Sequence, residues 1–248
     1  MQRILLLGGT QEAGKMARAL AMAGVEAIYS YAGRTANPAA QPLPCRVGGF
    51  GGVEGLIAYL KETRISHVID ATHPFAAGIS GNAIRACKVA DVPLIALERP
   101  AWQAEPGDDW LPVANIEGAI AALPTRPSRV FLAIGRQNLP PFAARPEHDY
   151  LLRLVDPPGI PPLSGARVVV DRGPFTLAGD LALLRDHRID IVVAKNAGGS
   201  GAIAKIEAAR QLGLRVIMIA RPVLPARPVL ARVDEVMRRL CHEADLGL

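Results

Sequence analysis

The 248-residue sequence has few aromatic side chains and no concentrated block of positive charge. Phe, Trp and Tyr make up only 4% of the residues, so the interleaved aromatics on which nucleic-acid bases stack are missing. The net charge of +5 is spread along the chain. These properties argue against a nucleic-acid partner and fit a small polyanionic ligand better.

Cysteines and long apolar runs are also scarce. Cys45, Cys87 and Cys241 are scattered, and no pair has CxxC or another metal-ligand spacing, so neither a disulfide framework nor a metal site is predicted. No apolar run approaches the roughly 18 residues of a membrane-spanning helix. The N-terminal MQRILLLGGT turns to glycine too early for a signal peptide. We therefore expect a cytoplasmic protein with no membrane association.

Short aliphatic runs alternate with segments of helical periodicity, which predicts parallel sheets with helices on both faces. In the first half of the chain, strands are expected at 3–9, 25–33, 66–72 and 92–99, and helices at 12–24, 52–64 and 79–91. In the second half, strands are expected at 128–135, 149–155, 166–173, 190–199 and 214–222, and helices at 177–187, 202–213 and 233–244.

This pattern predicts an α/β protein with two Rossmann-like parallel-sheet domains and an active site in the cleft between them. We expect residues 1–100 to form the N-terminal domain, 101–127 a connection with one short helical piece, and 128–248 the C-terminal domain. The pattern leaves open which domain the connection and the last helix pack on.

A glycine turn, LLLGGTQEAG, joins the first strand to the first helix, where phosphate-binding turns occur. Gly8, Gly9 and Gly14 do not have the GxGxxG spacing, and Glu12 lies near the helix start. Two interpretations stay open, a nucleotide site and a tight turn with an acid in the first helical turn.

The end of the second strand bears on the choice of nucleotide. NAD sites carry an acid there, whereas this chain has Ser30 and Arg34 in SYAGRT. Arginine suits a 2′-phosphate because it donates paired charge-assisted hydrogen bonds. If the turn binds a dinucleotide, NADPH is favoured over NADH; otherwise Ser30 and Arg34 are solvated loop residues.

Several later strand ends combine a cation with glycine or proline. They are 135–138, 171–175, 195–201 and 221–222. In KNAGGSG (195–201), the glycine spacing is not that of a Walker loop. A single loop of this kind is more simply a flexible turn with a solvated lysine, but four cationic strand ends predict a phosphate or polycarboxylate ligand.

The stretch VIDATHPFA (68–76) places an acid and an imidazole at a strand end. Asp70 is interpretable as a turn cap or as a contact to ribose or substrate, and His73 as a turn residue before proline or as a proton donor. Taken alone, each is more simply structural than catalytic.

As a set, these loops resemble the precorrin-6A/cobalt-precorrin-6A reductase family of cobalamin biosynthesis. The matching motifs are GGTQEA (8–13), DATHPFA (70–76), RPAW (99–102), VFLAIGRQNL (130–139), RGPF (172–175), KNAGGSG (195–201) and ARP (220–222). The resemblance extends from residue 4 to about residue 222. Ala197 departs from it, because the family often has Ser there.

The resemblance implies an oxidoreductase acting on CH–CH groups, in which NADPH reduces one double bond of the precorrin-6A macrocycle to give precorrin-6B. It implies an N-terminal dinucleotide-binding domain, a C-terminal substrate domain, a polycarboxylate tetrapyrrole as partner, no metal, and a monomer or weak homo-oligomer. The implied cofactor contacts are Gly8, Gly9, Thr10, Glu12, Ser30, Arg34 and Thr72. The implied substrate contacts are Arg136, Arg172, Lys195, Asn196, Gly198, Gly199, Ser200 and Arg221, with His73 and Asp70 as candidate catalytic residues.

Three alternatives stay open. One is the same reduction of cobalt-precorrin-6A in the anaerobic route, with NADH or NADPH. Another is a non-catalytic nucleotide- or tetrapyrrole-binding protein. The third is an unrelated NADP-dependent reductase with a Tyr-x-x-x-Lys dyad, although no lysine stands four residues after Tyr29, Tyr31, Tyr59 or Tyr150.

Overall fold

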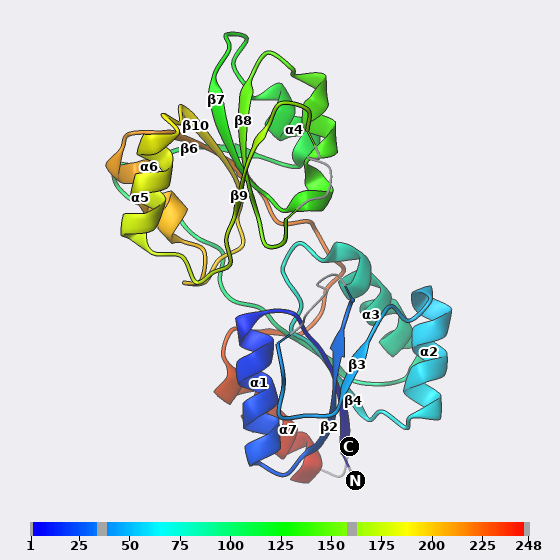
Figure 1. Ribbon diagram of the computed structural model, residues 1–248. Coiled ribbons are helices and arrows are strands. Elements are labelled where there is room, and N and C mark those ends of the chain that lie inside the picture. Colours follow the sequence, from blue (N-terminus) through cyan, green and yellow to red (C-terminus); the bar gives the residue numbers. More distant parts are fainter. Residues whose placement is uncertain (1, 34–38, 158–162, 246–248) are drawn as a thin grey trace. The chain divides into compact units, whose positions relative to one another are not determined.

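A computed structural model describes residues 2–33, 39–157 and 163–245 of the chain. The chain divides into two compact units, which are unit 1 (Met1–Pro100 with Val223–Leu248) and unit 2 (Ala101–Pro222). Each unit has one six-stranded sheet whose strand pairs are all parallel, flanked by helices (Figure 1). The predicted fold class of two parallel-sheet α/β domains is therefore confirmed.

Sheet A of unit 1 has the strand order β12-β5-β4-β1-β2-β3. Its strands are β1 (Arg3–Leu7), β2 (Glu26–Tyr31), β3 (Cys45–Val47), β4 (His67–Asp70), β5 (Leu94–Leu97) and β12 (Val229–Leu230). The chain builds outward from β1 to β3 and then resumes on the other side of β1 with β4. Ligands of open parallel sheets bind beyond the carboxyl ends of the strands at such a reversal point.

The helices of unit 1 cover both faces of sheet A (Figure 1). They are α1 (Gln11–Met22), α2 (Gly52–Glu62), α3 (Ala77–Ala90) and α7 (Val233–Asp245). Unit 1 has one hydrophobic core on each face of sheet A. Alternate residues of β1 belong to different cores, because successive side chains of a strand point to opposite faces. Ile4 and Leu6 pack with residues of α1 and α7, whereas Leu5 and Leu7 pack with residues of α2 and α3.

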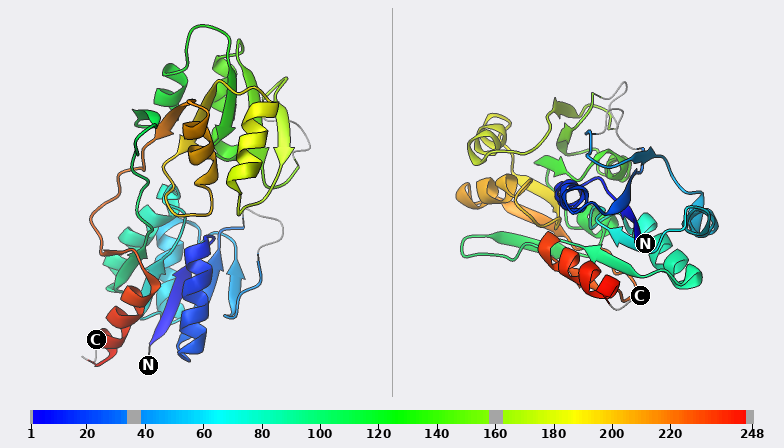
Figure 2. Two further views of the ribbon diagram at one scale, coloured as in Figure 1. Left: turned by 90° about the vertical axis from the view of Figure 1, so that its left-hand side faces the viewer. Right: turned by 90° about the horizontal axis from the view of Figure 1, so that it is seen from below.

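The C-terminal segment belongs to unit 1, which differs from the predicted assignment of residues 128–248 to one domain. Val236 and Leu240 of α7 are buried in the core beside α1. Gln2 Nε2 donates to the Leu240 carbonyl at 3.0 Å, so the start of β1 and the end of α7 lie side by side (Figure 2). The periodicity of a helix shows that it has an apolar face but not which sheet that face covers.

Unit 2 contains sheet B, with the strand order β6-β11-β10-β7-β8-β9. Its strands are β6 (Asp109–Val113), β7 (Arg129–Ala133), β8 (Asp149–Leu154), β9 (Arg167–Val170), β10 (Ile191–Lys195) and β11 (Arg215–Ile219). Its helices are α4 (Ile116–Ala121), η1 (Arg136–Asn138), η2 (Pro140–Ala144), α5 (Leu177–Asp186) and α6 (Ala204–Gln211). Residues of α5 and α6 pack on one face of the sheet, and α4 and η2 lie on the other (Figure 1).

Residues 101–127, predicted as a connection with one short helical piece, form part of unit 2. They supply α4 and β6, and β6 pairs with β11 at the sheet edge, where Pro112 is tolerated. Conversely, β12 follows β11 in the chain but pairs with β5 in sheet A. Thus β6, which follows β5 of sheet A in the chain, is an edge strand of sheet B, and β12, which follows β11 of sheet B, is an edge strand of sheet A. Short edge strands such as DWLPV and VL carry too little periodicity to be predicted.

Within the described ranges, no helix is both long and apolar enough to cross a membrane.

The packing of α7 on unit 1 can be tested through Leu240, whose side chain is 2% exposed. We expect Leu240→Ala to lower the free energy of unfolding by about 2–5 kcal/mol, because it leaves a cavity beside α1. Arg238 on the same helix is exposed and forms a surface ion pair with Asp234, so Arg238→Ala should change stability by less than about 0.5 kcal/mol. Urea unfolding measures both, and equal losses would contradict this packing.

Candidate functional site

The predicted glycine turn lies between β1 and α1 at the carboxyl edge of sheet A. Gly9 has φ +118°, a conformation that side chains disfavour, and a Cβ at this position would meet no atom within 4 Å. Thr10 is the N-cap of α1, and its Oγ1 accepts a hydrogen bond from Ala13 N at 3.1 Å. The turn therefore leaves open space over Gly9 next to the positive end of α1.

Tyr29 lies directly beneath this turn and was not predicted. Its hydroxyl accepts a hydrogen bond from Gly9 N at 2.9 Å, and a Cβ on Gly8 would lie 2.1 Å from its ring. Burial raises the pKa of the Tyr29 hydroxyl, which keeps it neutral. Because Gly9 N is used by Tyr29, the amides left for a ligand are those at the start of α1, including Gln11 and Glu12.

Glu12 is already paired with a cation. Arg99, just after β5, lies with Nη1 2.6 Å from Glu12 Oε2, and both side chains are mostly buried. An unpaired acid in the first turn of α1 would repel an anionic ligand at this helix end. Arg99 offsets that charge, so the acid does not exclude an anion there.

Ser30 at the end of β2 is buried, with 5% exposure, and is held by an arginine that sequence reasoning missed. Arg46 Nη1 donates to Ser30 Oγ at 2.8 Å and to the Gly48 carbonyl at 3.0 Å. Its guanidinium also lies 3.8 Å from the ring centre of Phe50. The two residues meet because β2 and β3 pair in the register Ser30↔Arg46. Arg34 lies outside the described residues.

Asp70, the last residue of β4, forms a local turn. Its Oδ1 accepts hydrogen bonds from Thr72 N at 3.1 Å and from Thr72 Oγ1 at 2.7 Å. Ser80 Oγ lies 3.2 Å from Thr72 Oγ1. Thr10 Oγ1 donates to the Ala71 carbonyl at 2.8 Å, so the glycine turn and the Asp70 loop are directly joined. The hydroxyls of Thr10 and Thr72 thus serve first to build the two loops.

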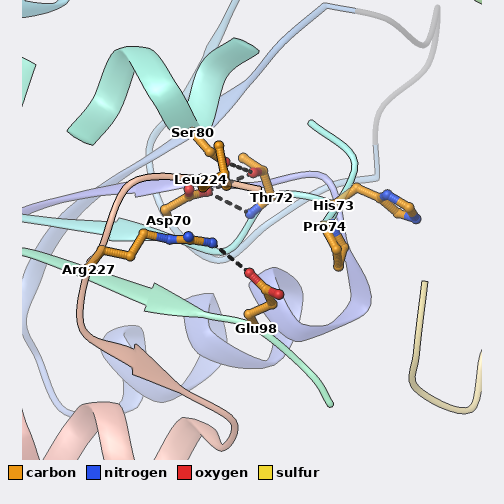
Figure 3. Close-up of a pocket in the computed structure, with 8 residues that line it drawn as sticks. All are labelled: Asp70, Thr72, His73, Pro74, Ser80, Glu98, Leu224 and Arg227. Carbon is orange, nitrogen blue, oxygen red and sulfur yellow. Dashed lines mark hydrogen bonds and ion pairs between the residues drawn. The ribbon is translucent and has the colours of Figure 1, made fainter. Parts of the chain in front are cut away.

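His73 is exposed, and its ring points away from Asp70 (Figure 3). Its Nδ1 accepts a hydrogen bond from Phe75 N at 3.2 Å, which assigns the ring proton of the neutral form to Nε2. The structure therefore brings His73 and Asp70 onto one loop but does not join them as a dyad.

A small polar pocket lies beside the Asp70 loop in unit 1 (Figure 3). Its lining residues are Asp70, Thr72, His73, Pro74, Ser80, Glu98, Leu224 and Arg227. Arg227 Nη2 and Glu98 Oε2 form an ion pair at 2.6 Å across it. Sequence reasoning missed both, because Glu98 follows β5 whereas Arg227 precedes β12, and only the pairing of those strands brings them together.

Four predicted cations follow strands of sheet B and therefore lie at its carboxyl edge. They are Arg136 after β7, Arg172 after β9, Lys195 at the end of β10 and Arg221 after β11. From β11 to β9 the order has four strand intervals, which at the usual spacing is about 19 Å. Arg136 and Arg172 are exposed, and Arg172 lies 3.6 Å from Asp156. This edge thus presents a wide row of positive charge.

The loop after β10 is held by hydrogen bonds from other residues of unit 2. Asn196 Oδ1 accepts from Trp102 N at 2.8 Å, and its Nδ2 donates to the Trp102 carbonyl at 3.0 Å. Trp102 Nε1 donates to the Gly199 carbonyl at 2.8 Å. Arg221 donates to the carbonyls of Asn196 and Ala197 at 3.0 and 3.1 Å. Asn196 and Arg221 therefore shape this loop.

Gly198 and Gly199 are adjacent residues at φ 69° and 71°, which explains why both are glycine. Ser200 is exposed at the end of this turn. Lys205, which was not predicted, is buried and donates from Nζ to the Ala202 carbonyl at 2.5 Å. The two glycines allow the backbone of the loop to turn, and the hydrogen bond of Lys205 holds the end of the loop where α6 begins.

A buried ion pair supports the RGPF loop and was also missed. Arg153 of β8 and Asp180 of α5 are paired, with side-chain exposures of 6% and 3%. The Arg153 guanidinium lies 3.7 Å from the ring centre of Phe175, the last residue of the motif. This contact holds the loop that presents Arg172.

In the part of the chain that the structure describes, no group of three or more His, Cys, Asp or Glu side chains is arranged to hold a metal ion. The predicted location of the site between the two domains stays a prediction.

Comparison with known proteins gives consistent matches along the chain. A family model described as Precorrin-6x reductase CbiJ/CobK matches residues 3–241. Precorrin-6A reductase of Rhodobacter capsulatus is 59% identical over 238 residues, which are 96% of this chain and 95% of the relative. Cobalt-precorrin-6A reductase of Salmonella typhimurium is 31% identical over 233 residues, 88% and 87% of the two chains. A solved structure named CobK precorrin-6A reductase has a TM-score of 0.94 and 58% identity, covering 98% of this chain and 97% of that one.

The contact of Gly8 with Tyr29 yields a stability prediction. We expect Gly8→Ala to lower the free energy of unfolding by about 1–3 kcal/mol, because the added methyl group overlaps the buried ring. Gly14→Ala is the matched control, since a Cβ there meets nothing closer than 3.7 Å, and it should stabilise α1 by about 0.5–1 kcal/mol. Chemical denaturation measures both changes, and a neutral Gly8→Ala would contradict the close contact.

Proposed function

The chain belongs to the Precorrin-6x reductase CbiJ/CobK family, and we propose that it uses NADPH to reduce one double bond of precorrin-6A, giving precorrin-6B in cobalamin biosynthesis. The observation that carries this proposal is the 59% identity to a protein named precorrin-6A reductase over nearly the full length of both chains. The relative named for the cobalt-containing substrate is 31% identical, which favours the metal-free macrocycle.

Unit 1 is the proposed site of the cofactor. The open space over Gly9 allows a pyrophosphate to approach the backbone, and the amides at the start of α1 supply hydrogen-bond donors. The ion pair of Arg99 with Glu12 supports this assignment, because the guanidinium offsets the negative charge that would repel the pyrophosphate. Thr10 and Thr72 act by holding the two loops around this position.

The 2′-phosphate of NADPH is assigned to Arg34, with Ser30 as its support. Ser30 is buried and its hydroxyl accepts a hydrogen bond from Arg46, so Ser30 and Arg46 fix the end of β2 from which the Arg34 segment departs. An arginine at this end of the strand suits a phosphate better than the ribose hydroxyl that NADH would present.

Unit 2 is the proposed site of the macrocycle. Precorrin-6A carries many acetate and propionate carboxylates, and Arg136, Arg172 and Lys195 provide cations along one edge of sheet B. Gly198, Gly199 and Ser200 add a backbone turn at the same edge. Asn196 and Arg221 hold that turn through their hydrogen bonds, so their proposed contribution is to position it. The wide spacing of these cations supports a large polycarboxylate over a single phosphate group.

The cofactor supplies the hydride for one ring carbon of the substrate, and a proton goes to the neighbouring carbon. The residues of this chain contribute by holding the two reactants in orientation and by excluding water. For the proton, His73 is a candidate in its imidazolium form, with Nε2 the ring nitrogen that does not face Phe75 N. Asp70 is a candidate for positioning, since its carboxylate is engaged by Thr72.

The proposal is tested by incubating the pure protein with NADPH and precorrin-6A. We expect loss of the nicotinamide absorbance together with a change in the macrocycle spectrum. Parallel reactions with cobalt-precorrin-6A and with NADH distinguish the anaerobic-route alternative. Binding of NADPH or of the macrocycle without turnover of either substrate would favour the non-catalytic binding protein and overturn the reductase assignment.

Arg34→Ala tests the phosphate assignment separately. We expect the variant to bind NADPH about tenfold or more weakly, because it loses charge-assisted hydrogen bonds, with little change for NADH. Arg18→Ala is the control, since Arg18 is an exposed arginine of α1 in the same unit. Calorimetric titration of both nucleotides measures the change, and equal losses for the two would exclude a 2′-phosphate contact.

A further inference from the structure

The pocket beside Asp70 lies in the half of sheet A that the adenosine end of a dinucleotide does not use. A Rossmann sheet is built from two mononucleotide-binding halves, and Ser30 at the end of β2 marks the half assigned to adenosine. Asp70 ends β4 and Glu98 follows β5, so the pocket belongs to the other half. The bond from Thr10 Oγ1 to the Ala71 carbonyl joins it directly to the glycine turn.

The charge of the pocket selects against anions. Two carboxylates, Asp70 and Glu98, line it together with one guanidinium, that of Arg227, and Arg227 is paired with Glu98. A phosphate or a carboxylate would therefore be repelled, whereas a neutral group that donates hydrogen bonds would be accepted.

Asp70 also has an unused acceptor. Its side chain is more than nine-tenths buried, at 4% exposure, and the hydrogen bonds from Thr72 both end on Oδ1. Among the described residues, no donor bonds to Oδ2, which leaves this oxygen for the pocket that Asp70 lines (Figure 3). A ligand that supplies an N–H can therefore form a charge-assisted hydrogen bond with this oxygen.

We propose that this pocket binds the carboxamide of the nicotinamide ring, with Asp70 accepting a hydrogen bond from the amide nitrogen. The inference rests on the proposed use of a nicotinamide cofactor. A primary amide is neutral, small and a donor, as the pocket requires. Glu98 and Arg227 form an ion pair at the pocket wall, and Thr72 donates a hydrogen bond to the Asp70 carboxylate. The position of this carboxylate, the proposed acceptor, is therefore fixed before the cofactor binds. Asp70 is thus a positioning residue that sets the orientation of the ring.

The experiment compares NADPH with its reduced 3-acetylpyridine analogue, which keeps the carbonyl but lacks the amide N–H. Calorimetric titration of the wild-type protein should show a preference for NADPH of about tenfold or more, the usual cost of losing a hydrogen bond to a charged group. In Asp70→Asn the preference should fall below about threefold, mainly through weaker binding of NADPH. Asp91→Asn, which removes an exposed acid at the end of α3, should leave the preference unchanged.

The outcomes separate this inference from the proposed function. Failure of the wild-type protein to bind either nucleotide would overturn the cofactor proposal and the carboxamide site together. Tight binding of NADPH with no preference over the analogue would overturn the carboxamide site alone, and that comparison needs no variant. Equal weakening of both nucleotides in Asp70→Asn would also overturn it, because a purely structural role predicts that result.

Discussion

Parallel pairing throughout both sheets is the constraint on which the candidate sites depend. Because all the strand pairs run in one direction, every strand of a sheet delivers its following loop to the same edge. In unit 1 this brings the glycine turn, the Ser30 end of β2 and the Asp70 loop together. In unit 2 it aligns Arg136, Arg172 and Lys195. Residues far apart in the chain become neighbours through strand order alone.

Within each edge, hydrogen-bond satisfaction decides which polar residues remain for a ligand. The N–H of Gly9 already donates to the hydroxyl of Tyr29, and the hydroxyl of Ser30 already accepts a hydrogen bond from Arg46. The side-chain amide of Asn196 accepts a hydrogen bond from the N–H of Trp102 and donates one to its carbonyl. Polar groups in a buried loop must be paired, so part of each motif serves the loop itself. The groups left over, such as the second oxygen of Asp70 and the exposed guanidinium of Arg136, are the ones on which recognition is proposed to rest.

Much of the fold was predictable because its central strands are strongly patterned. RILLL, HVID and IVVAK are short apolar runs that end at loop residues, as strands buried on both faces do. The edge strands β6 and β12 were not predictable, since one contains Pro112 and the other has two residues. The packing of α7 was left open for a related reason. Its apolar face suits either sheet, and only its contact with α1 decides between them.

The sequence by itself determined the parallel α/β class, the positions of the strand-end motifs and the family, because each depends on local order along the chain. The tertiary structure alone decided which residues complete the sites. Arg46 meets Ser30 through the register of β3, and Arg227 meets Glu98 through the pairing of β12 with β5. Such contacts join residues separated by as many as 129 positions, as Arg227 and Glu98 are. No local pattern encodes them, because they arise from the order in which strands join a sheet.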